Sequence, residues 1–192
     1  MKRTILAMSL AVAALGVQAA EVGGVKLEDR LRLSPTGPDL VLNGAGIRTR
    51  VFFKVYVGGL YLTEKKGAAG DVLALAGPKR VSMTMLRDLT AQQLSEALAE
   101  GIRNNASAAE QDALKARINE LLGIMNALGE AKTGDTILLD FLPESGTRVV
   151  VNGQPRGKPI AGEDFYRALL KIWLGEKPVD EDLKKGMLGQ PG

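Results

Sequence analysis

The feature that most constrains the fold of this chain is the stretch from Asn43 to Leu62, NGAGIRTRVFFKVYVGGLYL. Two closely spaced glycines, Gly44 and Gly46, predict a bend at its start. The long run that follows is rich in Val, Phe and Tyr, which is typical of a β-strand. Side chains of a strand alternate between its two faces, so the odd and even positions of this run predict two different surfaces.

These two predicted faces differ in chemical character. The odd positions, from Ile47 to Tyr61, are nearly all apolar and suit a protein core. The even positions begin with three cations and a phenol: Arg48, Arg50, Lys54 and Tyr56. The even face then becomes apolar toward the end of the run.

The even face has two interpretations. It could be a sheet surface half exposed to water, with its cations pointing into solvent. Alternatively it lines a partly covered cleft, in which Arg48 and Tyr56 meet an anionic head group while Phe52, Leu60 and Leu62 hold an apolar tail. In an unbroken strand Arg48 and Tyr56 would share a face but lie far apart. A bulge or bend at 49–51 would be needed to bring them together.

The run from Gly44 to Arg48 (GAGIR) and the run from Phe53 to Leu62 (FKVYVGGLYL) resemble the chalcone isomerase-like family, and specifically its secreted bacterial branch. The similarity extends through the Gly-Lys-Pro-Ile-Ala-Gly segment at 157–162 into the last predicted helix. The resemblance implies an α+β fold, in which a large antiparallel sheet is covered on one face by a layer of helices. A ligand cleft would lie between the two layers.

The resemblance also implies roles for two residues. In the plant chalcone isomerases an arginine after a Gly-x-Gly turn assists ring closure, and Arg48 matches it. Those enzymes use a threonine in the next strand, where this sequence has Tyr56, and the intervening segment is shorter here. The fatty-acid-binding relatives instead hold the carboxylate of an acyl chain with an arginine and a tyrosine, and this sequence is similar to that pattern.

The N-terminal residues have the three parts of a secretory signal. Met1-Lys2-Arg3 is basic, Thr4 to Val17 is apolar, and Val17 to Ala20 offers small residues for cleavage. We expect cleavage after Ala19 or Ala20, which gives a signal peptide at 1–20 and one chalcone isomerase-like domain at 21–192. The expected location is the periplasm of a bacterium. No other segment predicts a membrane span.

Charge and composition narrow the classes of partner. Cleavage would remove Lys2 and Arg3, so the 25 basic residues become 23 against 22 acids, and the net charge falls from +3 to +1. The remaining cations are scattered among acids along the sequence. This balance gives no argument for nucleic acid or for an anionic membrane as a partner.

Missing residue types exclude whole reaction classes. The sequence contains no histidine and no cysteine. Catalysis by Ser-His-Asp or Cys-His pairs and the usual zinc sites are therefore excluded. The Gly44-Ala45-Gly46 turn lacks the third glycine and the βαβ setting of a dinucleotide site. We expect no metal and no cofactor.

The rest of the chain predicts the helices of the covering layer. Thr90 to Gln93 and Ser107 to Glu110 both match capping boxes, and apolar residues follow each at helical spacing. A final helix should end at Gly175. The charged, Gly-rich tail after Pro178 is predicted to be loosely held.

Three functions stay open from the sequence. The first is a non-catalytic periplasmic binding protein for a fatty acid or similar amphiphilic carboxylate. The second is a chalcone isomerase-like intramolecular lyase, in which Arg48 would stabilise the enolate during ring closure by oxa-Michael addition. The third is an envelope structural or interaction protein, which a cleft filled by side chains would favour. The identity of any protein partner does not follow from the sequence.

Overall fold

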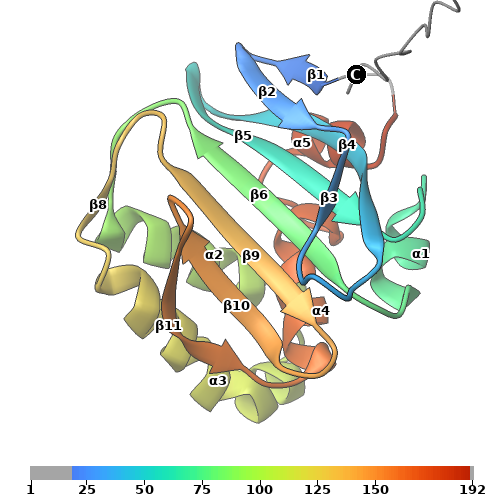
Figure 1. The fold of residues 1–192 in the computed structure, drawn as a ribbon. Helices are drawn as coiled ribbons and strands as arrows, with labels where there is room; N and C mark the ends of the chain where they lie inside the picture. Colours follow the sequence, from blue (N-terminus) through green and yellow to red (C-terminus); the bar gives the residue numbers. More distant parts are fainter. Residues whose placement is uncertain (1–18, 191–192) are drawn as a thin grey trace, which may run out of the picture.

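The computed structural model describes residues 19–190 (Figure 1). The strands are β1 (Ala19–Val22), β2 (Val25–Glu28), β3 (Arg30–Arg32), β4 (Asp39–Arg50), β5 (Phe53–Leu62), β6 (Lys79–Met85), β7 (Leu89–Thr90), β8 (Glu130–Ala131), β9 (Thr136–Leu142), β10 (Gly146–Val151) and β11 (Gln154–Ile160). The helices are α1 (Ala69–Ala74), α2 (Ala91–Asn105), α3 (Ala108–Asn126), α4 (Glu163–Leu174) and α5 (Glu181–Met187). The predicted signal peptide lies outside the described residues, apart from Ala19 and Ala20 at the start of β1.

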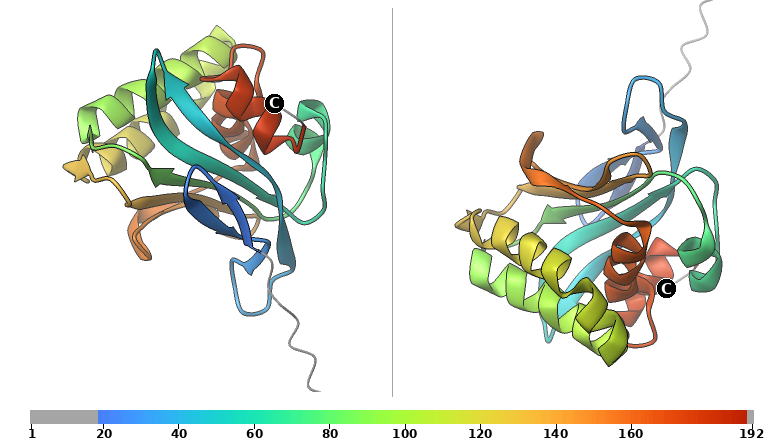
Figure 2. Two further views of the ribbon diagram at one scale, coloured as in Figure 1. Left: turned by 90° about the horizontal axis from the view of Figure 1, so that it is seen from above. Right: turned by 90° about the horizontal axis from the view of Figure 1, so that it is seen from below.

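Seven strands form one antiparallel sheet in the order β11-β10-β9-β6-β5-β4-β3. Figure 2 shows the helices together on one side of this sheet and the β1–β2 hairpin on the other. The main apolar core lies between the sheet and the helices. A smaller cluster around Leu27, Val57 and Tyr61 lies under the β1–β2 hairpin. The α+β architecture predicted from the sequence is therefore confirmed.

Both predicted capping boxes are present. The Thr90 hydroxyl accepts from the Gln93 backbone N–H, and the Gln93 side chain accepts in return from the Thr90 N–H. Ser107 and Glu110 make the same exchange at the start of α3. These bonds satisfy backbone donors that a starting helix leaves free, so they fix where α2 and α3 begin.

The predicted single strand from Ile47 to Leu62 is wrong, because the chain reverses in its middle. β4 runs to Arg50 and β5 starts at Phe53, and the two strands pair in antiparallel register. The turn contains Val51 at a φ of 60°, in the left-handed region. The required bend near 49–51 is thus present as a hairpin, and it makes Arg48 and Tyr56 direct cross-strand partners.

The predicted bend at Gly44 and Gly46 is also wrong, because both glycines lie inside β4. They leave room for α5 on the helix side of the sheet. A Cβ at Gly44 would lie 2.1 Å from the Gly186 carbonyl oxygen, and one at Gly46 would lie 3.2 Å from the Leu183 Cα. The cross-strand partner of Gly46 is Gly58. The three glycines together form a surface without side chains, against which α5 packs.

The prediction that the tail after Pro178 is loosely held is wrong, because this segment folds into α5. The Asp180 carboxylate caps this helix by accepting from the Leu183 N–H at 2.9 Å, and its second oxygen accepts from the Thr49 N–H at 2.8 Å. Leu183 and Met187 are fully buried, and Leu183 lies against Gly46 and Gly58. Composition misled the prediction because two apolar residues four positions apart are enough to bury one face of a short helix.

Candidate functional site

The candidate site is built on the pair of Arg48 in β4 and Tyr56 in β5. The two residues face each other across the hairpin. The Arg48 guanidinium carbon lies 5.6 Å from the centre of the Tyr56 ring, within cation–π distance. Tyr56 is 3% exposed, whereas Arg48 is partly exposed. The pair therefore places a permanent positive charge at the boundary between the core and solvent.

A tryptophan of α4 completes this pair. The Trp173 indole N–H donates to the Tyr56 hydroxyl oxygen at 2.8 Å. Burial raises the pKa of the Tyr56 hydroxyl above its ordinary value, although the neighbouring Arg48 charge opposes part of the rise. The hydroxyl is thus protonated at neutral pH. Among the hydrogen bonds of residues 19–190, none uses this proton as the donor, so it is available to an acceptor in the site.

Arg48 carries a buried donor without a partner. Its Nε–H makes no hydrogen bond with any of the described residues. Leaving such a group buried and unpaired costs about 1–3 kcal/mol. Folded proteins satisfy most buried polar groups, so an unpaired arginine N–H marks a position where an external acceptor would be stabilised.

Two hollows meet at Arg48. The outer recess has a volume of about 330 Å³ and is mostly polar, with walls from Arg48, Arg50, Gln93, Glu96, Ala97, Glu100, Gly101, Asn104, Lys177, Pro178 and Val179. The inner crevice measures about 20 Å³ and is mostly apolar, with walls from Arg48, Tyr56, Met83, Leu94, Ala97, Leu98, Met125, Ile137, Ile172, Trp173 and Val179. Arg48 therefore lies between a polar, charged recess and a narrow apolar crevice, which is formed by the sheet and the helices.

The structure does not bring the other predicted site residues to this pair. Phe52 lies in the β4–β5 turn and is 89% exposed. Leu60 and Leu62 are fully buried in the main core, and neither lines the recess or the crevice. Leu60 instead pairs with Gly44 in the part of the sheet that α5 covers.

Sequence reasoning missed Trp173 and Lys177 as site residues. Trp173 falls within the predicted final helix that ends at Gly175, and the helical pattern alone gives it no role in a site. A signal was present, since a buried tryptophan usually finds an acceptor for its N–H and this chain has a single tryptophan. Lys177 gave no such signal. Its place in the recess depends on Asn105, whose side chain bonds both the Lys177 carbonyl and its N–H.

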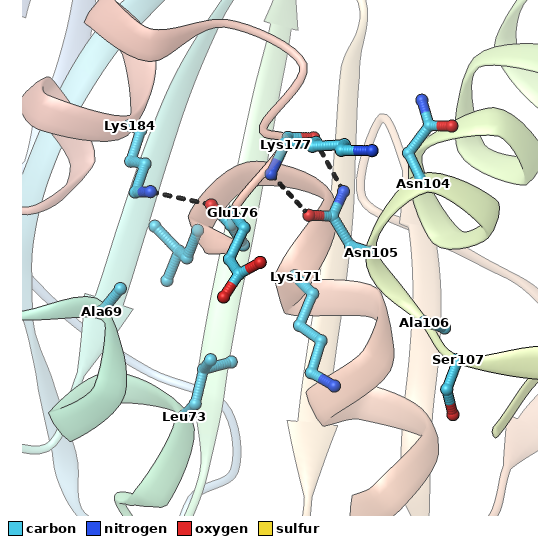
Figure 3. Close-up of a pocket in the computed structure, with 12 residues that line it drawn as sticks. Ala69, Leu73, Asn104, Asn105, Ala106, Ser107, Lys171, Glu176, Lys177 and Lys184 are labelled. Atoms are coloured by element: carbon cyan, nitrogen blue, oxygen red, sulfur yellow. Dashed lines mark hydrogen bonds between the residues drawn. The ribbon is translucent and has the colours of Figure 1, made fainter.

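A larger recess of about 650 Å³ adjoins the outer recess, with which it shares Asn104 and Lys177, and lies between α1, the α2–α3 corner and the α4–α5 connection (Figure 3). Two of its three lysines are engaged: Lys171 pairs with Glu110 at 2.9 Å, and Lys184 donates to the Gly175 carbonyl. The Lys171 ammonium, together with the Ser107 N–H, lowers the pKa of Glu110 to about 2. These bonds join the helical segments around the recess to one another.

Residues 19–190 contain no group of three or more acids placed to hold a metal ion. None of the helices in that range is long and apolar enough to cross a membrane.

Comparisons with known proteins give the family of the chain and support its fold. A family model described as chalcone isomerase-like matches residues 19–189. The crystal structure of a fatty-acid binding protein from Arabidopsis thaliana superposes with a TM-score of 0.65, covering 86% of this chain and 92% of the plant chain, at 15% sequence identity. At that identity the likeness shows the fold alone. No curated protein matches the chain.

Proposed function

Because this chain belongs to the chalcone isomerase-like family, we propose that it binds a fatty acid or a similar amphiphilic carboxylate and does not transform it. The observation that carries the proposal is the buried Nε–H of Arg48, which has no partner among residues 19–190 and lies where a polar recess meets an apolar crevice. The plant structure of the same fold is that of a fatty-acid binding protein, which supports the choice of ligand class.

The head group would be held by Arg48 and Tyr56. An arginine presents planar, permanently charged donors that match the two oxygens of a carboxylate, and the Tyr56 proton adds one more hydrogen bond. Three cations around the recess, Arg48, Arg50 and Lys177, outnumber the acids Glu96 and Glu100. The local charge therefore favours an anion despite the near-neutral chain.

The acyl tail would enter the crevice beyond Arg48. At about 20 Å³ the crevice has room for about one water, so a tail requires α2 to move away from α4 and the sheet. Two of its walls are methionines, Met83 and Met125, whose unbranched side chains adapt to new shapes. In this proposal binding is coupled to opening of the helix layer.

The proposal also places the protein in the bacterial periplasm, after cleavage of a signal peptide. The support is the basic, apolar and small-residue pattern of residues 1–20. Cell fractionation and intact-mass measurement test it: the exported chain should begin at Ala20 or Glu21. A full-length chain retained in the cytoplasm would overturn the location without touching the binding site.

The test of binding is calorimetry with decanoate below its micelle concentration. Arg48→Ala should abolish binding, because removing one partner of a buried charge pair costs about 2–5 kcal/mol. Arg48→Lys should restore it only in part, since an ammonium lacks the paired donors. Arg156→Ala, on the exposed strand β11, removes the same charge and should bind like the parent protein. Equal affinity in Arg48→Ala and Arg156→Ala would end the proposal.

A second candidate is a non-catalytic interaction protein of the envelope, and the small volume of the crevice favours it. Native mass spectrometry of the protein taken from its own cells separates the two. A retained acyl carboxylate supports ligand binding, and an unliganded chain in complex with another protein supports the interaction role. Arg48-dependent loss of chalcone absorbance would instead establish an isomerase.

A further inference from the structure

The end of the β4–β5 hairpin exposes three consecutive large apolar side chains. Val51, Phe52 and Phe53 are 77%, 89% and 60% exposed, and they are the exposed large hydrophobic residues of the described chain. They sit at the free end of the hairpin, at the top of the left view in Figure 2. We call these three residues the apolar tip. A contiguous exposed apolar group of this kind marks an interaction site more often than isolated surface residues do.

Cations surround the apolar tip. Arg50 and Lys54 flank it in sequence, and the Arg87 guanidinium lies over the Phe53 ring at 4.8 Å. The segment from Arg48 to Lys54 contains no acid. Asp88, next to Arg87, is held by hydrogen bonds from the Thr133 N–H and hydroxyl at 2.7 and 2.8 Å. The tip thus combines three apolar residues with three neighbouring cations, Arg50, Lys54 and Arg87.

The backbone of the tip is strained. Val51 has a φ of 60°, where a β-branched side chain is unfavourable and asparagine or glycine is usual. Turn geometry therefore does not explain the valine. An apolar side chain held there at a cost in stability is consistent with selection for contact rather than for folding.

We propose that the apolar tip docks on the surface of an anionic phospholipid bilayer. Phe52 and its neighbours would enter the interface between head groups and acyl chains, while Arg50, Lys54 and Arg87 would contact lipid phosphates. The charge pattern favours a lipid surface over a protein partner, because an apolar patch flanked by three cations matches an apolar layer beneath a plane of anions. Net charge gave no such indication, and the fold adds Arg87 to the two cations that flank the tip in sequence.

Docking would place the outer recess near the bilayer. Arg48 and Arg50, which are two residues apart on β4, both line that recess. An amphiphilic carboxylate dissolved in the membrane would then lie close to its proposed site. The docking itself does not depend on ligand binding, so either proposal can fail without the other.

Vesicle sedimentation tests the docking. The chain from Ala19 contains every strand and helix of the described fold, and it would be mixed with vesicles of phosphatidylcholine alone or with one third phosphatidylglycerol. We expect binding to the anionic vesicles that weakens with added salt. Phe52→Ser should lower the partition coefficient about tenfold or more and Phe52→Leu only slightly, following the loss of buried apolar area. Arg50→Ser should lower it about fivefold.

Arg156→Ser is the matched control for charge, because it removes one exposed cation far from the tip. Its partition coefficient should stay within a factor of two of the parent value. Equal losses in Arg50→Ser and Arg156→Ser, or unchanged binding in Phe52→Ser, would overturn the proposal. Failure of the parent protein to bind anionic vesicles, or concentration-dependent dimers that Phe52→Ser abolishes, would also overturn it.

Discussion

The two ends of the β4–β5 hairpin are built in opposite ways. At one end Gly44, Gly46 and Gly58 remove side chains so that α5 can approach the sheet closely. At the other end, bulky or charged residues occupy positions that lower the stability of the fold. Arg48 has a buried N–H without a partner among the described residues, and Val51 has a strained backbone. The same two strands thus join a well-packed region to an unfavourable one.

This difference indicates that one end of the hairpin contributes to the stability of the fold and the other to binding. The packed end holds the C-terminal helix, through Leu183 on the glycines and through Asn43, whose amide bonds the carbonyls of Lys66 and Met187. The other end has a buried N–H without a partner among the described residues and apolar side chains exposed to solvent. Both features are expected of residues retained for binding. Substitutions should therefore change stability at the glycine end and ligand or surface binding at the tip end.

The largest expected effect is at Gly44. A Cβ there would lie 2.1 Å from the Gly186 carbonyl oxygen, a backbone atom that can move only if α5 moves. Gly44→Ala should lower the free energy of unfolding by about 3 kcal/mol, measured by urea denaturation. It should also expose residues after Lys177 to protease. Decanoate affinity should change little if the two ends are independent.

Gly123→Ala is the matched control for the glycine substitution. Gly123 lies in α3, and an added Cβ would meet nothing within 4 Å. Alanine is the better helix former by about 1 kcal/mol, so this variant should be slightly more stable than the parent protein. A destabilised Gly123→Ala, or an unaffected Gly44→Ala, would contradict the close approach of α5.

The glycine end also shows what the sequence could and could not predict. Capping boxes and the resemblance at GAGIR predicted the architecture, and the resemblance singled out Arg48 and Tyr56, but the hairpin that pairs these two residues was not predicted. The role of Gly44 was misread, because a glycine that permits close packing looks the same in sequence as one that permits a bend. Alternation also failed beyond Arg50, since a turn at a valine with positive φ carries no local turn signal.

A smaller effect is expected at the Tyr56–Trp173 bond, which lies between the two ends. Tyr56→Phe leaves the buried indole N–H without its acceptor and should cost about 1–3 kcal/mol of stability. Trp173→Phe should cost a similar amount, and the double variant should cost less than the sum of the two. Urea denaturation of all four proteins gives the coupling.

Tyr166→Phe is the control that separates stability from binding. Tyr166 is also fully buried, and its hydroxyl donates to the Leu139 carbonyl at 2.9 Å. Its loss should cost about 1–3 kcal/mol as well, with no change in decanoate affinity. Tyr56→Phe should weaken decanoate binding about fivefold or more through the lost hydrogen bond. Equal decanoate affinities in Tyr56→Phe and Tyr166→Phe would show that the Tyr56 hydroxyl does not contact the ligand.

The smallest stability change, and one of opposite sign, is expected at Val51. Glycine at φ 60° relieves a strain of about 1–2 kcal/mol, while its greater freedom in the unfolded chain costs about 0.5–1 kcal/mol. Val51→Gly should therefore raise stability by about 0.5 kcal/mol and reduce vesicle binding. Asn152 shares the positive φ, but its side chain bonds Thr136 and Asp135, so Asn152→Gly should destabilise. If Val51→Gly destabilises too, the valine packs within the fold, and the contrast between the two ends no longer holds.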